Sequence, residues 1–121
     1  MLPEKVLPGP GEVKAIYFAM GNQVNEKAFK KVPTPARYYE LITDCISGSY
    51  ASTNDAGNDL IITFKIESIK EKPPVYIKFY DNENQLFKIN DKNYKGTRTY
   101  LIYQYLEQMQ YDMMYDNYRD R

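Results

Sequence analysis

The sequence contains no histidine, no tryptophan and a single cysteine, Cys45, in 121 residues. The absence of histidine excludes Ser-His and Cys-His nucleophilic pairs and every histidine-ligated metal site within one chain. One cysteine is too few for a disulfide framework, a zinc cluster or an iron–sulfur centre. Many enzyme and cofactor sites are therefore excluded, and we expect neither a bound cofactor nor a metal ion.

Long apolar runs and an excess of charge of one sign are also missing. No stretch approaches the roughly 18 to 20 apolar residues of a membrane span. The 16 basic and 16 acidic side chains give a net charge of zero, which argues against a general electrostatic attraction to nucleic acid but leaves a local basic patch open. Residues Met1–Lys5 lack the apolar segment of a secretory signal. We expect a cytoplasmic or virion-associated protein, and prior removal of a signal stays open as an alternative.

The composition that remains is typical of a small globular domain, with 43% apolar and 26% charged residues. Asn, Lys, Ile and Tyr make up 44 of the residues; their codons are rich in A and T, which indicates a bacterial or phage genome of that kind. Residues 1–12 contain three prolines and two glycines and predict an extended arm, either a loose terminus or a contact to a neighbouring subunit. Residues 13–121 are predicted to form one α+β domain.

Four segments have the pattern of β-strands. Val13–Met20 is a short and almost wholly apolar run, typical of a strand that is buried on both faces. Leu60–Ile69 and Val75–Tyr80 alternate apolar and polar side chains, and Gln85–Asn90 follows as a short fourth strand. The short turns between the last three predict an antiparallel meander. Residues 25–32 fit either one or two helical turns or a short returning strand.

Two segments have the pattern of helices. Thr34 is a candidate N-cap, Pro35 suits the first helical position, and Gly48 is a candidate stop. Thr97 can cap a second helix that, without proline or glycine through Arg121, spans about 25 residues. The order β-α-β-β-β-α predicts an α+β fold. We expect a small antiparallel sheet of about four strands, two helices packed on one face, and a long C-terminal helix.

The predicted C-terminal helix has two distinct faces. One sector is predicted to face the core and contains Ile102, Tyr105, Leu106, Met109 and Met113. Four tyrosines cluster on the opposite side: Tyr100, Tyr111, Tyr115 and Tyr118. Tyrosine combines a large contact area with a polar tip, so it suits interfaces. We expect this tyrosine stripe to bind a protein partner or a second copy of the chain; a solvated face, or one packed under the N-terminal arm, is the alternative.

The outer side of the second predicted hairpin is another candidate surface. Tyr76, Lys78 and Tyr80 share one side of a strand, and Lys88 lies on the next strand. Aromatic rings can stack with bases and lysines can meet phosphates, as in sheet-based binders of single-stranded nucleic acid. The aromatic consensus of those modules is absent, and a solvated strand face is the alternative.

Acidic residues form two patterns that resemble cation sites only distantly. Asp112, Asp116 and Asp120 recur every four residues near the predicted C-terminus of a helix, and residues 54–59 form an oxygen-rich loop. Neither pattern has the ligand spacing of a calcium loop. We expect a solvated acidic edge in the first case and a connecting loop in the second.

Paired carboxylates are the catalytic arrangement that the composition leaves open. Glu40 and Asp44 lie four residues apart on the predicted helix, and Glu67 lies nearby on the sheet if the two elements pack together. Two such acids can hydrolyse a glycosidic bond, although a surface location is the simpler expectation. Cys45 lies on the apolar helix face and is predicted to be a buried structural thiol.

These observations favour a non-enzymatic binding protein. The first hypothesis is a protein–protein interaction or assembly domain, such as a phage or bacterial accessory protein, which acts through the tyrosine stripe and has no catalytic residues. The second hypothesis is a small domain that binds single-stranded nucleic acid through Tyr76, Lys78, Tyr80 and Lys88. A carboxylate-pair hydrolase is a distant third.

Overall fold

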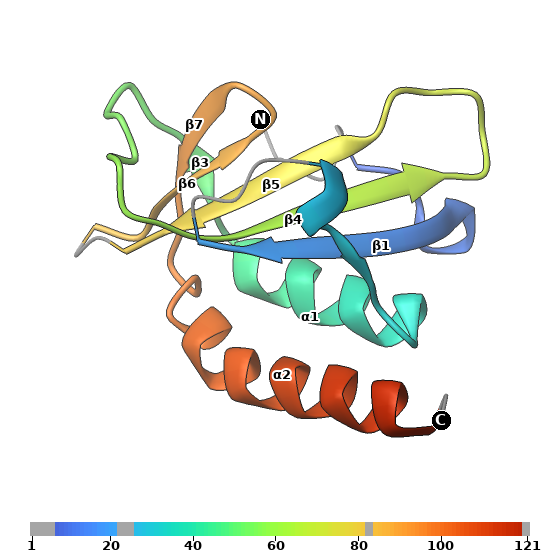
Figure 1. The fold of residues 1–121 in the computed structure, drawn as a ribbon. Coiled ribbons are helices and arrows are strands. Elements are labelled where there is room, and N and C mark those ends of the chain that lie inside the picture. Colours follow the sequence, from blue (N-terminus) through green and yellow to red (C-terminus); the bar gives the residue numbers. More distant parts are fainter. Residues whose placement is uncertain (1–6, 22–25, 82–83, 120–121) are drawn as a thin grey trace.

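A computed structural model describes residues 7–21, 26–81 and 84–119, with side chains described except at residues 26 and 112–119. The described residues form one seven-stranded antiparallel sheet with two α-helices on one side of it (Figure 1). In chain order the elements are the short 3₁₀ turn η2 (Pro10–Glu12), β1 (Val13–Met20), the 3₁₀ turn η3 (Glu26–Ala28), β2 (Lys30–Lys31), α1 (Pro35–Ile46), β3 (Tyr50–Ala51), β4 (Leu60–Ser68), β5 (Val75–Tyr80), β6 (Leu86–Ile89), β7 (Lys92–Lys95) and α2 (Leu101–Arg119).

The strand order across the sheet is β2-β1-β4-β5-β6-β7-β3, and every neighbouring pair is antiparallel. After β1 and β2, the chain passes through α1 from one edge of the sheet to β3 at the other edge. It then returns to β4 beside β1 and continues as a meander to β7. Among the described residues, no helix is both long and apolar enough to cross a membrane.

The prediction of about four strands is wrong, because the sheet has three more. The edge strands β2 and β3 contain two residues each, which is too short to show an alternating pattern. The strand β7 has the sequence KNYK, whose single apolar residue, Tyr94, resembles part of a polar turn. The hairpin between β6 and β7 closes at Asn90, which adopts a φ of 54°; asparagine tolerates this left-handed conformation better than most residues.

The segment at residues 25–32 combines both of its predicted alternatives. Within its described part, one 3₁₀ turn covers Glu26–Ala28, and the two-residue strand β2 follows and pairs with β1. The pairing places Lys31 opposite Tyr17. This strand gives β1 a neighbour on its free edge and brings the preceding residue, Phe29, close to the sheet.

The helix α1 begins and ends where its sequence predicts. Pro35 occupies its first turn, although Thr34 at the N-cap makes no side-chain hydrogen bond, and Gly48 after the helix has a φ of 75°. The side of α1 that faces the sheet is buried and consists of Tyr38, Tyr39, Ile42, Cys45 and Ile46. Helical spacing predicts a core face of Tyr38, Leu41, Ile42, Cys45 and Ile46. In the structure Leu41 is only half-buried and Tyr39 is buried as well.

The C-terminal helix is shorter than predicted, because α2 covers Leu101–Arg119 and does not begin near Thr97. The Thr97 hydroxyl donates to the Ser47 carbonyl at 3.4 Å, so it tethers the chain to the end of α1. The backbone N–H of Thr99 donates to Gln85 Oε1 at 3.0 Å, and the Thr99 hydroxyl lies 3.2 Å from the same oxygen. These tethers fix the residues before the helix in a turn, so the helix starts only after them.

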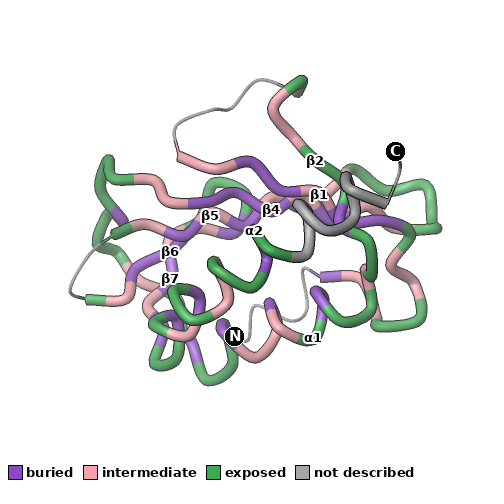
Figure 2. The backbone as a smooth tube through the Cα atoms, turned by 60° about the horizontal axis from the view of Figure 1, so that its bottom comes forward, coloured by how far each residue is buried: buried purple, intermediate pink, exposed green. Residues whose placement is uncertain are grey.

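The core lies between the sheet and the two helices, where strands and helices each contribute one apolar side. Figure 2 shows buried and half-buried residues alternating along the central strands. Four aromatic rings cross the sheet in contact: Phe64 with Phe79 at 6.1 Å between centroids, Phe79 with Phe87 at 5.6 Å, and Phe87 with Tyr94 at 5.7 Å. Such ring pairs add to the stability gained from area burial alone.

The described part of the N-terminal arm lies against α1 of its own chain. Leu7 is buried, and the hydroxyl of Tyr39 donates to the carbonyl of Pro8. Glu12 at the end of the arm forms an ion pair with Lys70 at 2.5 Å, and this pairing lowers the pKa of the Glu12 carboxyl. Residues 1–6 lie outside the described part of the chain.

Candidate functional site

The alternation of side chains gives the sheet two faces of different character. The inner face is apolar and packs against α1 and α2, whereas the opposite face, called the outer face below, is covered by neither of these helices (Figure 1). On β5 the outer side chains are Tyr76, Lys78 and Tyr80, which are half-buried and alternate with the buried Val75, Ile77 and Phe79. Polar and aromatic groups therefore line a face that the core does not use.

The strand register brings tyrosines and lysines of neighbouring strands together on the outer face. Lys78 of β5 lies opposite Lys88 of β6, and the Lys88 ammonium lies 6.0 Å from the centroid of the Tyr80 ring. Four residues on two adjacent strands thus form one surface, called the Tyr/Lys patch below: Tyr76, Lys78, Tyr80 and Lys88. Burial raises the pKa of Tyr80, with Lys88 acting in the opposite direction.

A second row of side chains extends this patch toward β1. Lys65 of β4 lies opposite both Tyr17 of β1 and Tyr76 of β5. Its ammonium lies 5.6 Å from the centroid of the Tyr17 ring, within the range of a cation–π contact. On the outer face, aromatic and cationic side chains therefore alternate across β1, β4 and β5 as well as along β5.

The positive charge of the patch is only partly balanced. Like charges directly opposite each other destabilise an antiparallel pair, and Lys78 and Lys88 are such a pair. Lys88 lies 3.7 Å from the Asp55 carboxylate. The pKa of Asp55 is lowered, first by a hydrogen bond from the Gly57 backbone and also by Lys88. Within the described residues, no acidic side chain forms an ion pair with Lys78, so its charge is available to an anion.

Thr63 of β4 lies next to Lys78 in the same cross-strand row. It is only 2% exposed, and its hydroxyl has no hydrogen-bond partner among the described residues. A buried polar group without a partner costs about 1–3 kcal/mol. The Thr63 hydroxyl lies beneath the patch and can therefore still form a hydrogen bond with a ligand.

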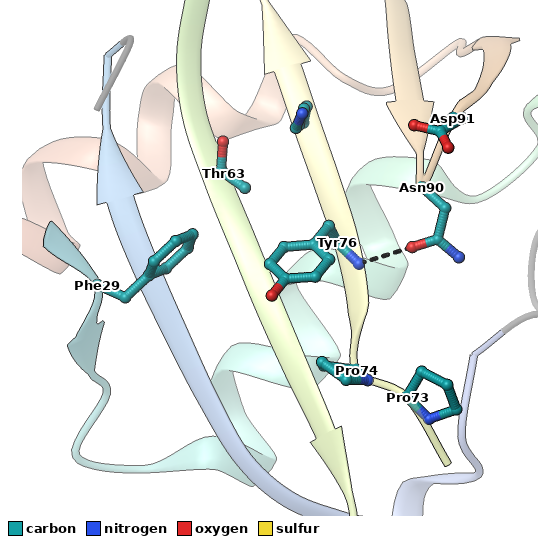
Figure 3. A pocket seen from close by; sticks show the side chains of 8 residues that line it. Phe29, Thr63, Pro73, Pro74, Tyr76, Asn90 and Asp91 are labelled. Atoms are coloured by element: carbon teal, nitrogen blue, oxygen red, sulfur yellow. Dashed lines mark hydrogen bonds between the residues drawn. The ribbon is translucent and has the colours of Figure 1, made fainter. Parts of the chain in front are cut away.

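A pocket of about 430 Å³ opens on the outer face beside Tyr76. Its apolar walls are Phe29, Tyr76, Pro73 and Pro74, and its polar lining is Thr63, Lys78, Asn90 and Asp91 (Figure 3). The rings of Phe29 and Tyr76 meet edge to face, with centroids 6.1 Å apart and planes at 64°. The backbone N–H of Tyr76 donates to Asn90 Oδ1 at 3.0 Å, so the turn after β6 is tied to the strand that carries the pocket.

Comparison with known proteins adds no relative. No protein-family model matches the chain, and no curated protein or solved structure is significantly similar to it.

The tyrosine stripe of the C-terminal helix is described in part. Tyr100, just before α2, is 52% exposed and Tyr111 is 62% exposed, whereas Tyr115 and Tyr118 lie outside the described side chains. Tyr103, which the sequence did not single out, is 47% exposed and its hydroxyl donates to Asp81 at 3.2 Å. On the other side of the helix, Ile102 and Met109 are buried and Tyr105 and Leu106 pack partly against the core, as predicted.

The structure does not bring the three predicted carboxylates together. Glu40 and Asp44 lie on α1, which packs against the inner face, whereas Glu67 alternates onto the outer face of β4. Asp44 is also engaged by Arg98, with 3.0 Å between their side-chain atoms. The geometry therefore offers no converging pair of acids from these residues.

Cys45 and the acidic loop also have local roles. Cys45 is fully buried, and this burial raises the pKa of its thiol to about 12, with Asp44 adding to the effect and Arg98 opposing it. In the loop, the Asp55 carboxylate accepts the Gly57 N–H at 3.1 Å. Within the described residues no group of three or more Cys, Asp or Glu side chains is suited to hold a metal ion. The predicted acidic ridge at Asp112, Asp116 and Asp120 lies outside the described side chains.

Of the eight residues that line the pocket, the sequence singled out only Tyr76 and Lys78 and missed the others, including Phe29 and Thr63. Phe29 lies in the segment whose structure was ambiguous, and its contact with Tyr76 depends on the pairing of β2 with β1. The alternation within Leu60–Ile69 puts Thr63 on the side of Ile61, Lys65 and Glu67, but its burial depends on neighbours from two other strands. A threonine between apolar residues in a central strand is the only local signal that the sequence carries.

Proposed function

We propose that this protein is a non-enzymatic domain that binds single-stranded nucleic acid on the outer face of its sheet. The observation that carries the proposal is the Tyr/Lys patch, where Tyr76 and Tyr80 flank Lys78 on β5 and Lys88 lies opposite it. Bases of any sequence can stack on tyrosine rings, and lysines can neutralise the phosphates between them. Since Lys78 has no described acidic partner, a phosphate would also relieve its repulsion with Lys88.

The dimensions of the patch suit a short stretch of single-stranded nucleic acid. Residues in a β-strand rise about 3.3 Å each, so Tyr76 and Tyr80 are separated by about 13 Å along β5. The Lys65 and Tyr17 row lengthens the surface across β4 and β1. The net charge of the chain is zero, so the attraction comes from this local group of lysines. We therefore expect modest affinity with a clear dependence on salt.

Replacement of Lys78 by glutamine tests the electrostatic part of the proposal. Fluorescence anisotropy with a labelled single-stranded oligonucleotide, repeated over a range of salt concentrations, gives the slope of log K against log salt. Each lost phosphate contact reduces the magnitude of this slope by about 0.7 for a single strand. We expect K78Q to weaken binding and to reduce the slope by about that amount.

The matched control is Lys92→Gln. Lys92 is exposed at the start of β7 and lies on the same side of that strand as the buried Tyr94, away from the outer face. K92Q removes the same charge from the chain and should leave affinity and slope unchanged. Equal effects of the two variants would show that only net charge matters and would contradict a specific surface.

A second candidate function is self-association through the tyrosine stripe, favoured by the exposure of Tyr100 and Tyr111. Rings that are more than half exposed bury large areas when a second copy packs against them. The double variant Tyr100→Ser and Tyr111→Ser should keep the fold and lower the native mass measured by light scattering. A mass that stays at one chain for both proteins, at all concentrations tested, would contradict self-association.

A further inference from the structure

We propose that the pocket beside Tyr76 is a subsite for one nucleobase of the bound strand, and that Thr63 supplies a hydrogen bond to the edge of that base. The inference rests on the proposed nucleic-acid binding and adds a preference among bases to it. The pocket differs from the Tyr/Lys patch as a whole because it combines apolar walls with a buried hydroxyl that has no described partner.

The Thr63 hydroxyl is the observation that points to a ligand. Valine has nearly the same shape as threonine and would fill the position without an unsatisfied polar atom. The hydroxyl of Thr63 is shielded from water and has gained no partner among the described residues. A hydroxyl can both donate and accept, so it can pair with either kind of group on a base edge. A bound base would supply the partner that the described part of the chain does not.

The walls of the pocket suit a flat aromatic ligand. Figure 3 shows Phe29 and Tyr76 facing each other across β4, with Pro73 and Pro74 just before the first residue of β5. The volume of about 430 Å³ is far larger than the roughly 30 Å³ that one water molecule occupies in the liquid. Stacking on Tyr76 and contact with the prolines would bury both sides of a base, as aromatic platforms do in single-strand binders.

The polar groups around the pocket have opposite charges and so suit different parts of a nucleotide. Lys78, two residues beyond Tyr76 on β5, is suited to a phosphate, whereas the Asp91 carboxylate is suited to N–H donors. Figure 3 places Asp91 and Phe29 on opposite sides of Tyr76. Adenine and cytosine carry an exocyclic amino group, and thymine has none. We therefore expect the subsite to favour adenine or cytosine over thymine.

The test compares oligo(dA), oligo(dC) and oligo(dT) of equal length by fluorescence anisotropy, with the wild-type chain and with Thr63→Val. The wild-type protein should bind oligo(dA) or oligo(dC) about 3- to 10-fold more tightly than oligo(dT), the range for a single net hydrogen bond. In T63V the affinity for all three oligonucleotides should fall by about 3- to 10-fold, because the hydroxyl pairs with either kind of base edge, while the preference and the salt dependence set by the lysines stay the same.

Thermal unfolding of the free proteins provides a second readout, with Thr99→Val as the matched control. The Thr99 side chain is also buried, but its hydroxyl has a partner in Gln85. T99V should lower the melting temperature and keep the base preference, whereas T63V should melt at the wild-type temperature or above it.

The outcomes separate the two proposals. No binding of any oligonucleotide overturns both of them. Equal affinity of the wild-type protein for the three oligonucleotides, or T63V affinities equal to those of the wild type, overturns the base subsite and leaves the nucleic-acid surface standing. A melting temperature of T63V lowered as far as that of T99V would show that the Thr63 hydroxyl has a partner within the free protein, which also overturns the subsite.

Discussion

Replacement of Phe87 by alanine is expected to cost about 3–5 kcal/mol of unfolding free energy, the range for removal of a buried phenyl ring. Phe87 is fully buried and its ring stacks between those of Phe79 and Tyr94, at 5.6 and 5.7 Å. The variant therefore loses two ring contacts as well as the buried area, and a cavity remains between strands that cannot easily collapse. Since a small domain has only about 5–15 kcal/mol of total stability, this single change removes a large share of it.

Urea unfolding followed by circular dichroism measures this loss as a shift of the midpoint at constant slope. Ile69→Ala is the control, because Ile69 is 62% exposed just after β4. Substitutions at such exposed positions usually change stability by less than about 0.5 kcal/mol. A loss for F87A no larger than that for I69A would contradict the aromatic row as a principal part of the core.

Removal of both tyrosines of the Tyr/Lys patch is the change expected to weaken nucleic-acid binding most. Alanine in place of a stacking aromatic residue costs about 1–3 kcal/mol per base. If each ring stacks one base, the variant with Tyr76→Ala and Tyr80→Ala should bind a single-stranded oligonucleotide about 30-fold more weakly or worse. The loss should persist at high salt, because stacking, unlike the contribution of Lys78, is not screened by ions.

Two exposed tyrosines away from the outer face provide the control for this measurement. Tyr100, just before α2, is 52% exposed and Tyr111 on α2 is 62% exposed, and α2 packs against the inner face of the sheet. Their double alanine variant removes the same two rings from the chain and should bind with wild-type affinity. Circular dichroism and the melting temperature establish that both variants fold. An affinity within twofold of wild type for Tyr76→Ala and Tyr80→Ala would contradict the proposed surface.

The strongly patterned elements of this fold were predictable from local sequence. The apolar run at β1, the alternation in β4 and β5, and the helical spacing in α1 each reflect burial of one or both sides of a single element. The extent of the sheet was not predictable, because β2 and β3 have two residues each and take their conformation from the strands they pair with. The start of α2 depends on tethers from Thr97 and Thr99 to distant residues.

The candidate site, too, was predictable from the sequence only in part. Alternation on β5 predicted that Tyr76, Lys78 and Tyr80 share a side, since neighbours two residues apart in a strand point the same way. The pocket beside them required Phe29, which lies far away in sequence and reaches Tyr76 only through the pairing of β2 with β1. The buried state of the Thr63 hydroxyl likewise depends on neighbours from other strands.

The sequence by itself determined which chemistry is open to this protein: without histidine and with one cysteine it cannot assemble the sites that need them, and it is rich in tyrosine, with 13 residues. Periodicity determined which residues share a side of each element, because that depends only on backbone geometry. The tertiary structure decided which sides meet. It placed both α-helices on one face of a seven-stranded sheet and left the opposite face to Tyr76, Lys78 and a buried hydroxyl without a described partner, since strand order and register arise from long-range packing.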